Sequence, residues 1–383
     1  MTPAQNSHSI ESTLLSVRLK ERIVRGGPMS VECYMDACLS DATAGYYPSK
    51  QPIGAGGDFI TAPEVSQVFG ELLGLWSYAV WQSMGSPDPV IFAELGPGRG
   101  TLMADALRAL HRLPGFVECA DVVLVETSPL LRGVQQETLA GCGTRLSWRE
   151  RIEALPPGPL IVIANEFIDA LPIRQIVWRG GQWRERCVQI GAKGGFEFCD
   201  GPAVASDGLR RDAQLQQLPE GSILEIRPAA NATVAALAGR ASQAPLAALI
   251  IDYGHEATEC GDTLQAVSRH KFADPLRDPG AVDLTAHVDF GALKDAAEAK
   301  GLRVYGPKPQ GALLLELGLE ARLEKLCEDA TDDQRDALVS GTTRLVRPRG
   351  HGTACSKRWP SPARILPPPP PSTKCLTMRA AMA

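Results

Sequence analysis

Short apolar runs that alternate with turns and helical patterns constrain the fold of this chain more than any other feature. The first run, Val90–Ala93, is followed by a glycine-rich turn and by a helical pattern that begins at Thr101 and stops at Pro114. The runs Val122–Val125 and Leu160–Ala164 are also followed by turn and helix signals. Because strands of this kind belong to a parallel sheet covered on both faces, we expect an α/β fold with a doubly wound, mostly parallel sheet. Further parts of the pattern are the helices Pro129–Leu139 and Phe290–Ala299 and the strands Ala247–Ile251 and Leu302–Tyr305.

A different pattern interrupts this alternation. Ile176–Arg179 and Gln182–Val188 alternate with period two around Gly180-Gly181, which is typical of an antiparallel hairpin, and a weaker pair surrounds Gly194-Gly195. We expect an antiparallel insertion over about residues 174–245. Its large side chains favour a docking surface for a protein, although a lid is an equally good interpretation; they are Trp178, Arg179, Trp183, Arg184 and Arg186.

Residues 1–86 are expected to form a separate N-terminal helical region. Thr61–Glu64 has the form of a capping box, and apolar residues from Val65 to Val80 repeat behind it at helical spacing. The preceding segment, Gly45–Asp58, is rich in Gly, Pro and Tyr, and such a loop can lie over a pocket. We therefore expect residues 1–86 to cover an active site in the main domain, which spans residues 87–345.

The composition excludes several classes of protein. Hydrophobic residues make up 44% of the chain and the net charge is only −5, so the chain as a whole is not disordered. The longest uncharged stretch, Leu72–Pro87, is interrupted and too short to span a membrane. Neither Cys-x-x-Cys pairs nor metal-ligand spacings occur, and the N-terminus shows no signal or transit peptide. We expect a reduced, cytoplasmic protein without metal, nucleic-acid partner or membrane insertion.

The turn after the first strand reads Glu94-Leu95-Gly96-Pro97-Gly98-Arg99-Gly100. The N–H groups of a glycine-rich turn, and the positive end of the helix behind it, approach whatever lies at the carboxyl edge of the sheet. The spacing misses the dinucleotide fingerprint and the Walker A motif, and Glu94 repels phosphate but suits a cationic group. Glu126 ends the next strand, where it can accept hydrogen bonds from both hydroxyls of a ribose. A nucleoside ligand with a positive charge fits both features.

Together these residues resemble the S-adenosylmethionine site of the Rossmann-like methyltransferases, where such a turn lies against the methionine part and the later acid holds the ribose. The resemblance implies S-adenosyl-L-methionine as cofactor, bound by Glu94, Gly96, Pro97, Gly98, Gly100, Glu126 and Asn165. Further stretches are similar to the MidA family, whose mitochondrial members assist respiratory complex I assembly by symmetric dimethylation of an arginine in a complex I subunit. The similarity extends from about Glu21 to Leu345, and its stretches are Gly57–Ser66, Asn165–Pro172, Ile251–Gly254 and Asp283–Phe290.

The acid-rich segment after Leu160–Ala164 suits an arginine acceptor. A guanidinium has a pKa above about 12, so carboxylates must orient its nucleophilic nitrogen and hold its charge during transfer. We expect Glu166, with Asn165 and Asp169, to be the catalytic residues, although Asn165 and Asp169 could instead only cap the turn. Weaker candidates for substrate binding are Asp58, Glu64, Tyr253, His255 and His287; Glu64 could be the capping-box acid and His287 a packed core histidine.

The predicted function is that of an S-adenosylmethionine-dependent protein methyltransferase that dimethylates an arginine of a complex I subunit symmetrically. Two alternatives stay open: a non-catalytic assembly factor that keeps the fold, and a methyltransferase for a small molecule. The intact glycine turn with Glu94 and Glu126 argues against the first, and the Trp- and Arg-rich hairpin argues against the second. The sequence leaves the oligomeric state open.

The last part of the chain differs in charge from the rest. Residues 337–383 hold eight Lys or Arg and no acid, although the whole chain has 39 basic and 44 acidic residues, and Pro367–Pro371 is an unbroken proline run. The family pattern continues past Leu345 roughly as Gly-x-Leu-Phe-Lys-x-Leu-Ala. With plausible GC-rich codons, Ala354–Pro360 read in another frame gives Leu-Phe-Lys-Ala-Leu-Ala. We therefore interpret residues 346–383 as a basic, Pro-rich tail that is a frameshift product from near Gly350, which resequencing the gene would test.

Overall fold

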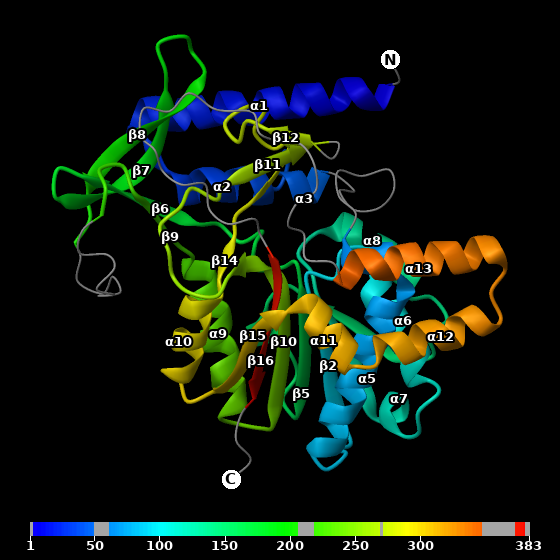
Figure 1. Ribbon diagram of the computed structural model, residues 1–383. Coiled ribbons are helices and arrows are strands. Elements are labelled where there is room, and N and C mark those ends of the chain that lie inside the picture. Colours follow the sequence, from blue (N-terminus) through cyan, green and yellow to red (C-terminus); the bar gives the residue numbers. More distant parts are fainter. Residues whose placement is uncertain (1–2, 50–60, 206–217, 269–270, 347–371, 380–383) are drawn as a thin grey trace.

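An eight-stranded, mostly parallel sheet forms the centre of the computed structural model, which describes residues 3–49, 61–205, 218–268, 271–346 and 372–379 (Figure 1). Strand β16 is antiparallel to both of its neighbours, β15 and β10. The strands β10, β5, β2, β3 and β4 are parallel to one another. The predicted α/β fold is confirmed. In sheet order the strands are β15 (Arg303–Pro309), β16 (Ser372–Arg379), β10 (Leu246–His255), β5 (Leu160–Asn165), β2 (Val90–Leu95), β3 (Ala120–Val125) and β4 (Arg145–Arg149), with β14 (Val288–Asp289) pairing β10.

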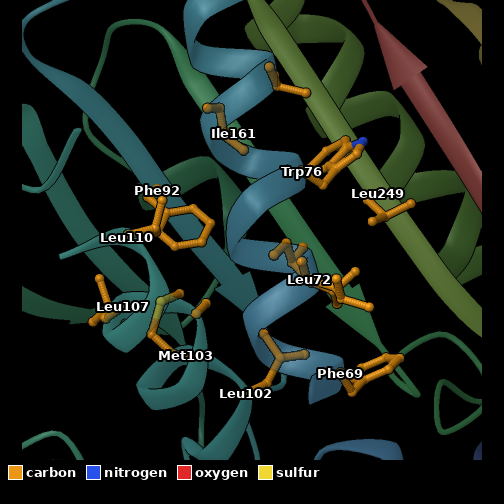
Figure 2. Packing of buried hydrophobic residues seen from close by; sticks show 14 of the residues in the cluster. Phe69, Leu72, Trp76, Phe92, Leu102, Met103, Leu107, Leu110, Ile161 and Leu249 are labelled. Atoms are coloured by element: carbon orange, nitrogen blue, oxygen red, sulfur yellow. The ribbon is translucent and has the colours of Figure 1, made fainter. Parts of the chain in front are cut away.

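Helices cover both faces of this sheet because successive strand residues point to opposite sides. Phe92, Ile161 and Leu249 belong to one hydrophobic cluster with α5 and α6. Figure 2 shows Leu249 beside Trp76 of α5 and Phe92 beside Leu110 of α6. The intervening strand residues face α9 and α10. The helices are α1 (Pro3–Gly26), α2 (Val31–Ser40), α3 (Tyr46–Ser49), α4 (Ala62–Val65), α5 (Gln67–Ser83), α6 (Thr101–Leu110), α7 (Phe116–Cys119), α8 (Pro129–Thr138), α9 (Pro228–Ala241), α10 (Phe290–Glu298), α11 (Gln310–Glu316), α12 (Leu319–Glu328) and α13 (Asp332–Val346).

The expected N-terminal region does not pack as one unit. α1, α2 and α3 share a hydrophobic cluster with β7 (Gln182–Ile190) and β13 (Asp283–Thr285), whereas α5 packs against the central sheet and α6. The apolar stripe of α5 explains the difference, since it is long enough to cover a whole sheet face. Among the described residues, no helix combines the length and apolar character needed to cross a membrane.

The predicted antiparallel insertion is present but shorter than expected. Its sheet has the order β1-β7-β6-β9, and β8 also pairs with β7. The Trp178 and Trp183 ring centroids lie 5.2 Å apart across β6 and β7. The insertion ends with β9, because the following helix α9 returns to the central sheet through Ala230, Val234 and Leu237. The remaining strands are β1 (Met29–Ser30), β6 (Arg174–Arg179), β7 (Gln182–Ile190), β8 (Phe196–Ala203) and β9 (Ile223–Ile226), and the small sheet β12-β11-β13 (Lys271–Ala273, Gln265–Ser268, Asp283–Thr285).

The predicted capping box at Thr61 is wrong. Thr61 begins only the single turn of α4, and its side chain makes no capping hydrogen bond. The long helix α5 begins one turn later at Ser66, whose side chain accepts a hydrogen bond from Val68 N. The Glu64 carboxylate is therefore free to leave its own helix, and it accepts a hydrogen bond from the Thr101 hydroxyl at 2.6 Å.

The end of the basic tail forms part of the central sheet. β16 pairs with β10 on one side and β15 on the other, and Leu376 and Met378 are fully buried (Figure 1). Residues 347–371, which include the proposed frameshift point, lie outside the described residues. The frameshift hypothesis stays a prediction.

Glu71 is a buried carboxylate that connects three helices. It lies in α5, accepts hydrogen bonds from Arg108 of α6 at 3.2 Å and from Arg322 of α12 at 2.7 Å, and its side chain is 2% exposed. We expect Glu71→Gln to lower the free energy of unfolding by about 2–3 kcal/mol, because both arginines lose a buried counter-charge while Arg108 stays partly solvated. Urea unfolding measures this. The same substitution at the exposed Glu324 of α12 is the control, and an equal effect there would contradict the prediction.

Candidate active site

The glycine turn between β2 and α6 has the conformation that its sequence requires. Gly96 and Gly100 have φ angles of 61° and 84°, in the left-handed region that favours glycine. A Cβ on Gly96 would also lie 2.8 Å from the Phe167 ring, so the turn and the end of β5 approach closely. Gly96 N donates to Val125 O at 3.1 Å, which ties the turn to β3. The turn therefore sits at the carboxyl edge of three adjacent strands.

A small cavity of about 50 Å³ opens at this edge. Its walls come from three parts of the chain: the glycine turn, the end of β5, and the segment around α4. Many of the predicted site residues meet here although they are far apart in the sequence. Those lining the cavity are Glu64, Glu94, Gly96, Pro97, Gly98, Asn165 and Glu166.

Two polar atoms in this cavity have no hydrogen-bond partner among the described residues. They are Glu94 Oε2 and Asn165 Oδ1, both buried. Burial raises the pKa of Glu94 to about 8. Two acceptors without donors suit a ligand group that is positively charged and donates several hydrogen bonds, such as the amino group of an amino acid. The observation fits S-adenosyl-L-methionine, whose methionine part carries such a group.

Glu126 follows β3 and is held by a network that reaches the glycine turn. Its carboxylate accepts hydrogen bonds from Ser128 N at 2.8 Å and from Gln135 Nε2 at 3.2 Å. Gln135 also donates to Gly98 O at 2.8 Å, and its own oxygen accepts from Trp148 Nε1 at 2.8 Å. Burial raises the pKa of Glu126, against hydrogen bonds that lower it. The network sets the position of the Glu126 carboxylate relative to the glycine turn.

Gln135 was not predicted as a site residue from the sequence. Its substitution tests the role of this network. We expect Gln135→Leu to weaken binding of S-adenosyl-L-methionine roughly 10-fold, because Gly98 and Glu126 lose a common buried donor worth about 1–1.5 kcal/mol. Calorimetric titration measures the affinity. Gln136→Leu changes an exposed residue of the same helix and should leave the affinity unchanged; equal weakening in both variants would show that the network has no such role.

Glu166 lies directly after β5 with an unusual backbone conformation. Its φ is 49°, a region that residues other than glycine rarely occupy. Its N–H donates to Ile251 O at 2.9 Å, and its Oε1 accepts from Ala62 N at 3.3 Å. The carboxylate therefore lies between the cofactor cavity and the α4 segment, where a second substrate could approach.

Asp169, the other predicted catalytic acid, lies elsewhere. It is buried beside Asp252 and Arg227 and does not line the cofactor cavity. Burial raises the pKa of Asp169 to about 6, against the Arg227 charge, which lowers it. The tight turn after β5 separates Asp169 from Glu166. Glu166 therefore lines the cofactor cavity, whereas Asp169 lies beside Arg227.

The weaker candidates divide between different places. His255 and His287 line a second, larger cavity of about 450 Å³, mostly apolar and walled by β9, α9 and α10. Burial lowers the pKa of His287 to about 4, so the ring is neutral at pH 7. Tyr253 is half-buried at the end of β10, and Asp58 lies outside the described residues. Within the part of the chain that the structure describes, no His, Cys, Asp and Glu cluster could hold a metal ion.

The parallel sheet, the glycine turn and the orphaned acceptors above it define a Rossmann-like methyltransferase that uses S-adenosyl-L-methionine. The comparison with known families agrees, since residues 72–308 match the family described as putative S-adenosyl-L-methionine-dependent methyltransferase. The chain belongs to this MidA-like methyltransferase family, as its motifs predicted. A solved COG1565 superfamily protein from Burkholderia thailandensis, bound to S-adenosyl-homocysteine, is 27% identical with a TM-score of 0.79, over 100% of this chain and 96% of that one. The predicted cofactor is confirmed.

Curated relatives are similar over most of their length. The Drosophila melanogaster protein named "Protein arginine methyltransferase NDUFAF7 homolog, mitochondrial" is 36% identical over 88% of this chain and 83% of its own. The Homo sapiens protein named "Protein arginine methyltransferase NDUFAF7, mitochondrial" is 33% identical over 87% of this chain and 80% of its own. The mitochondrial names of these relatives overturn the expectation of a cytoplasmic protein.

Proposed function

We propose that this methyltransferase acts on protein arginine and dimethylates it symmetrically in a subunit of respiratory complex I. The observation that supports an arginine acceptor is the Glu166 carboxylate, which stands at the edge of the cofactor cavity. The relatives named protein arginine methyltransferase point to the same class of substrate.

The residues have distinct roles in this proposal. Glu94 and Asn165 would hold the amino-acid part of the cofactor, and Glu126 the ribose. When bound, S-adenosyl-L-methionine supplies the methyl group from its sulfonium, leaving S-adenosyl-homocysteine as the methylated nitrogen releases a proton. Glu166 would pair with the guanidinium and aim one nitrogen toward the methyl group, since a carboxylate and a guanidinium form directional paired hydrogen bonds. The attraction between the Glu166 carboxylate and the guanidinium would be stronger when water is excluded from the pair, because the local dielectric constant is then lower.

Mass spectrometry of complex I subunits from cells with and without the gene tests the proposal. The expected result is one arginine that carries two methyl groups, one on each terminal nitrogen, only when the gene is present. The purified protein with S-adenosyl-L-methionine should then restore the modification on the subunit from the deletion strain. An unchanged methylation pattern would reject the proposed substrate.

The two alternatives give different results in the same experiments. A non-catalytic assembly factor would restore complex I without adding methyl groups, and a Glu94→Gln variant would restore it equally well. An enzyme for a small molecule would release S-adenosyl-homocysteine from a small-molecule extract and leave the subunit unmodified.

A further inference from the structure

The turn that carries Glu166 needs support from outside itself. Residues 166–171 connect β5 to the insertion without forming a helix or strand, and one internal bond, from Leu171 N to Ile168 O, closes the turn at 3.0 Å. The left-handed φ of Glu166 costs about 1–2 kcal/mol for a residue with a side chain. Such a conformation persists only where surrounding contacts determine it.

Asp252 supplies the first of these contacts. Its side chain is fully buried at the end of β10, the strand beside β5. One carboxylate oxygen accepts hydrogen bonds from Ile168 N at 2.9 Å and Asp169 N at 3.1 Å, and the other accepts from Tyr253 N at 2.8 Å. Two consecutive amides of the turn thus point at one oxygen, which anchors the turn to the neighbouring strand.

Arg227 holds the same turn through its carbonyl groups. From the start of α9 its guanidinium donates to Leu171 O at 3.1 Å and to Asp169 O at 3.3 Å. It also donates to Ala286 O at 2.8 Å, and Ala286 N donates to Asp169 O at 3.1 Å, so the turn is joined to the β13–β14 segment. A planar fork with five donors is required for this pattern, and lysine does not supply one.

The two acids of this group depend on the same arginine. Burial raises the pKa of Asp169 and of Asp252, and the charge of Asp169 raises the pKa of Asp252 further, whereas the buried Arg227 guanidinium lowers both pKa values. The three groups make a buried network in which the backbone of the turn provides most of the hydrogen-bond partners. Neither Asp252 nor Arg227 lines the cofactor cavity, although Arg227 lines the second, larger cavity. An effect of these residues on chemistry at the cofactor cavity is therefore expected to act through the turn.

We propose that Asp252 and Arg227 are positioning residues for methyl transfer, which hold the turn 166–171 so that the Glu166 carboxylate stays at the cofactor cavity. The inference rests on the proposed function in one respect: Glu166 is taken to orient the acceptor. Neither Asp252 nor Arg227 is proposed to contact the cofactor or the acceptor.

The test uses Asp252→Asn in the full chain. The new side chain keeps one acceptor oxygen, so its NH2 group must face either the N–H of Tyr253 or the N–H groups of Ile168 and Asp169. In both orientations donors face each other, which weakens the anchor of the turn at nearly constant side-chain volume. We expect kcat on the complex I subunit to fall about 10- to 100-fold, because a displacement near 1 Å of an orienting group has effects of this size. The affinity for S-adenosyl-L-methionine should stay within about twofold. Amide hydrogen exchange should become faster in residues 166–171 and at Tyr253, which also donates to Asp252, and should stay unchanged elsewhere.

Arg227→Lys is the second variant, in case Asp252→Asn does not fold, and it should give the same local exchange and loss of kcat. Asp333→Asn and Arg303→Lys are matched controls at exposed positions and should change neither. Unchanged exchange of residues 166–171 in both variants overturns the proposal. Faster exchange throughout the chain also overturns it, because that result indicates loss of stability alone. If the wild type methylates no arginine, the proposed function fails, whereas the exchange experiment still decides whether the two residues hold the turn.

Discussion

Glu166→Gln is expected to retain the affinity for S-adenosyl-L-methionine and to lose methyl transfer. Gln keeps the oxygen that accepts from Ala62 N, so the backbone around the cavity has no reason to move. It cannot hold the guanidinium charge as the nitrogen is methylated, and loss of one such electrostatic contact costs on the order of 10²–10³-fold in kcat. Single-turnover transfer to the complex I subunit measures the rate, and calorimetry measures cofactor binding.

The matched control for this variant is Glu153→Gln, the same change at an exposed position after β4. It should transfer methyl groups at the wild-type rate. Full transfer activity of Glu166→Gln would remove Glu166 from the reaction. Loss of cofactor affinity together with transfer would instead place Glu166 among the cofactor-binding residues.

Glu94→Gln is expected to weaken binding of S-adenosyl-L-methionine about 10- to 100-fold. The substitution removes the buried carboxylate proposed to pair with the cofactor's amino group, and a hydrogen bond to a charged group is worth about 1.5–3 kcal/mol. Binding of the cation favours the ionised carboxylate, whose pKa is about 8 in the free protein. Wild-type affinity should therefore rise with pH toward about pH 8, near which the amino group itself loses its proton. Glu94→Gln should lose the proton release that accompanies binding at Glu94.

The stability of the free protein is a second, independent test of the raised Glu94 pKa. Cofactor affinity should rise with pH, whereas the contribution of Glu94 to stability should fall. The Glu94 pKa is raised in the folded chain, so its contribution to the free energy of unfolding is fully present below about pH 4.5 and is lost as the pH rises through about 8. The glutamine in Glu94→Gln cannot ionise, so the variant does not lose this part of the free energy of unfolding as the pH rises. It should unfold no more easily than the wild type at pH 8. Thermal unfolding from pH 5 to 8 measures the difference, with Glu118→Gln at an exposed position as control.

For the binding experiment, a Glu94→Gln variant that binds S-adenosyl-L-methionine as tightly as the wild type would contradict the role assigned to Glu94.

Much of the sheet could be predicted, as could several residues that line the candidate cofactor cavity, because their signals are local. Apolar runs of strand length identify β2, β3 and β5, and their ends place Glu94, Glu126 and Asn165 at one edge of a parallel sheet. Gln135 had no such signal, since its role depends on the distance between α8 and the glycine turn.

The sequence by itself determined which residues end each strand and which turn needs glycine, because backbone conformation and the period of side chains are decided by near neighbours. Only the tertiary structure decided what those side chains face. It directs Glu64 to Thr101 instead of its own helix, turns Asp169 toward Asp252 and leaves Glu166 at the cavity. Two carboxylates three residues apart look equivalent in a sequence. They differ here because the partners of each come from strands and helices far along the chain, and burial makes those partners decisive.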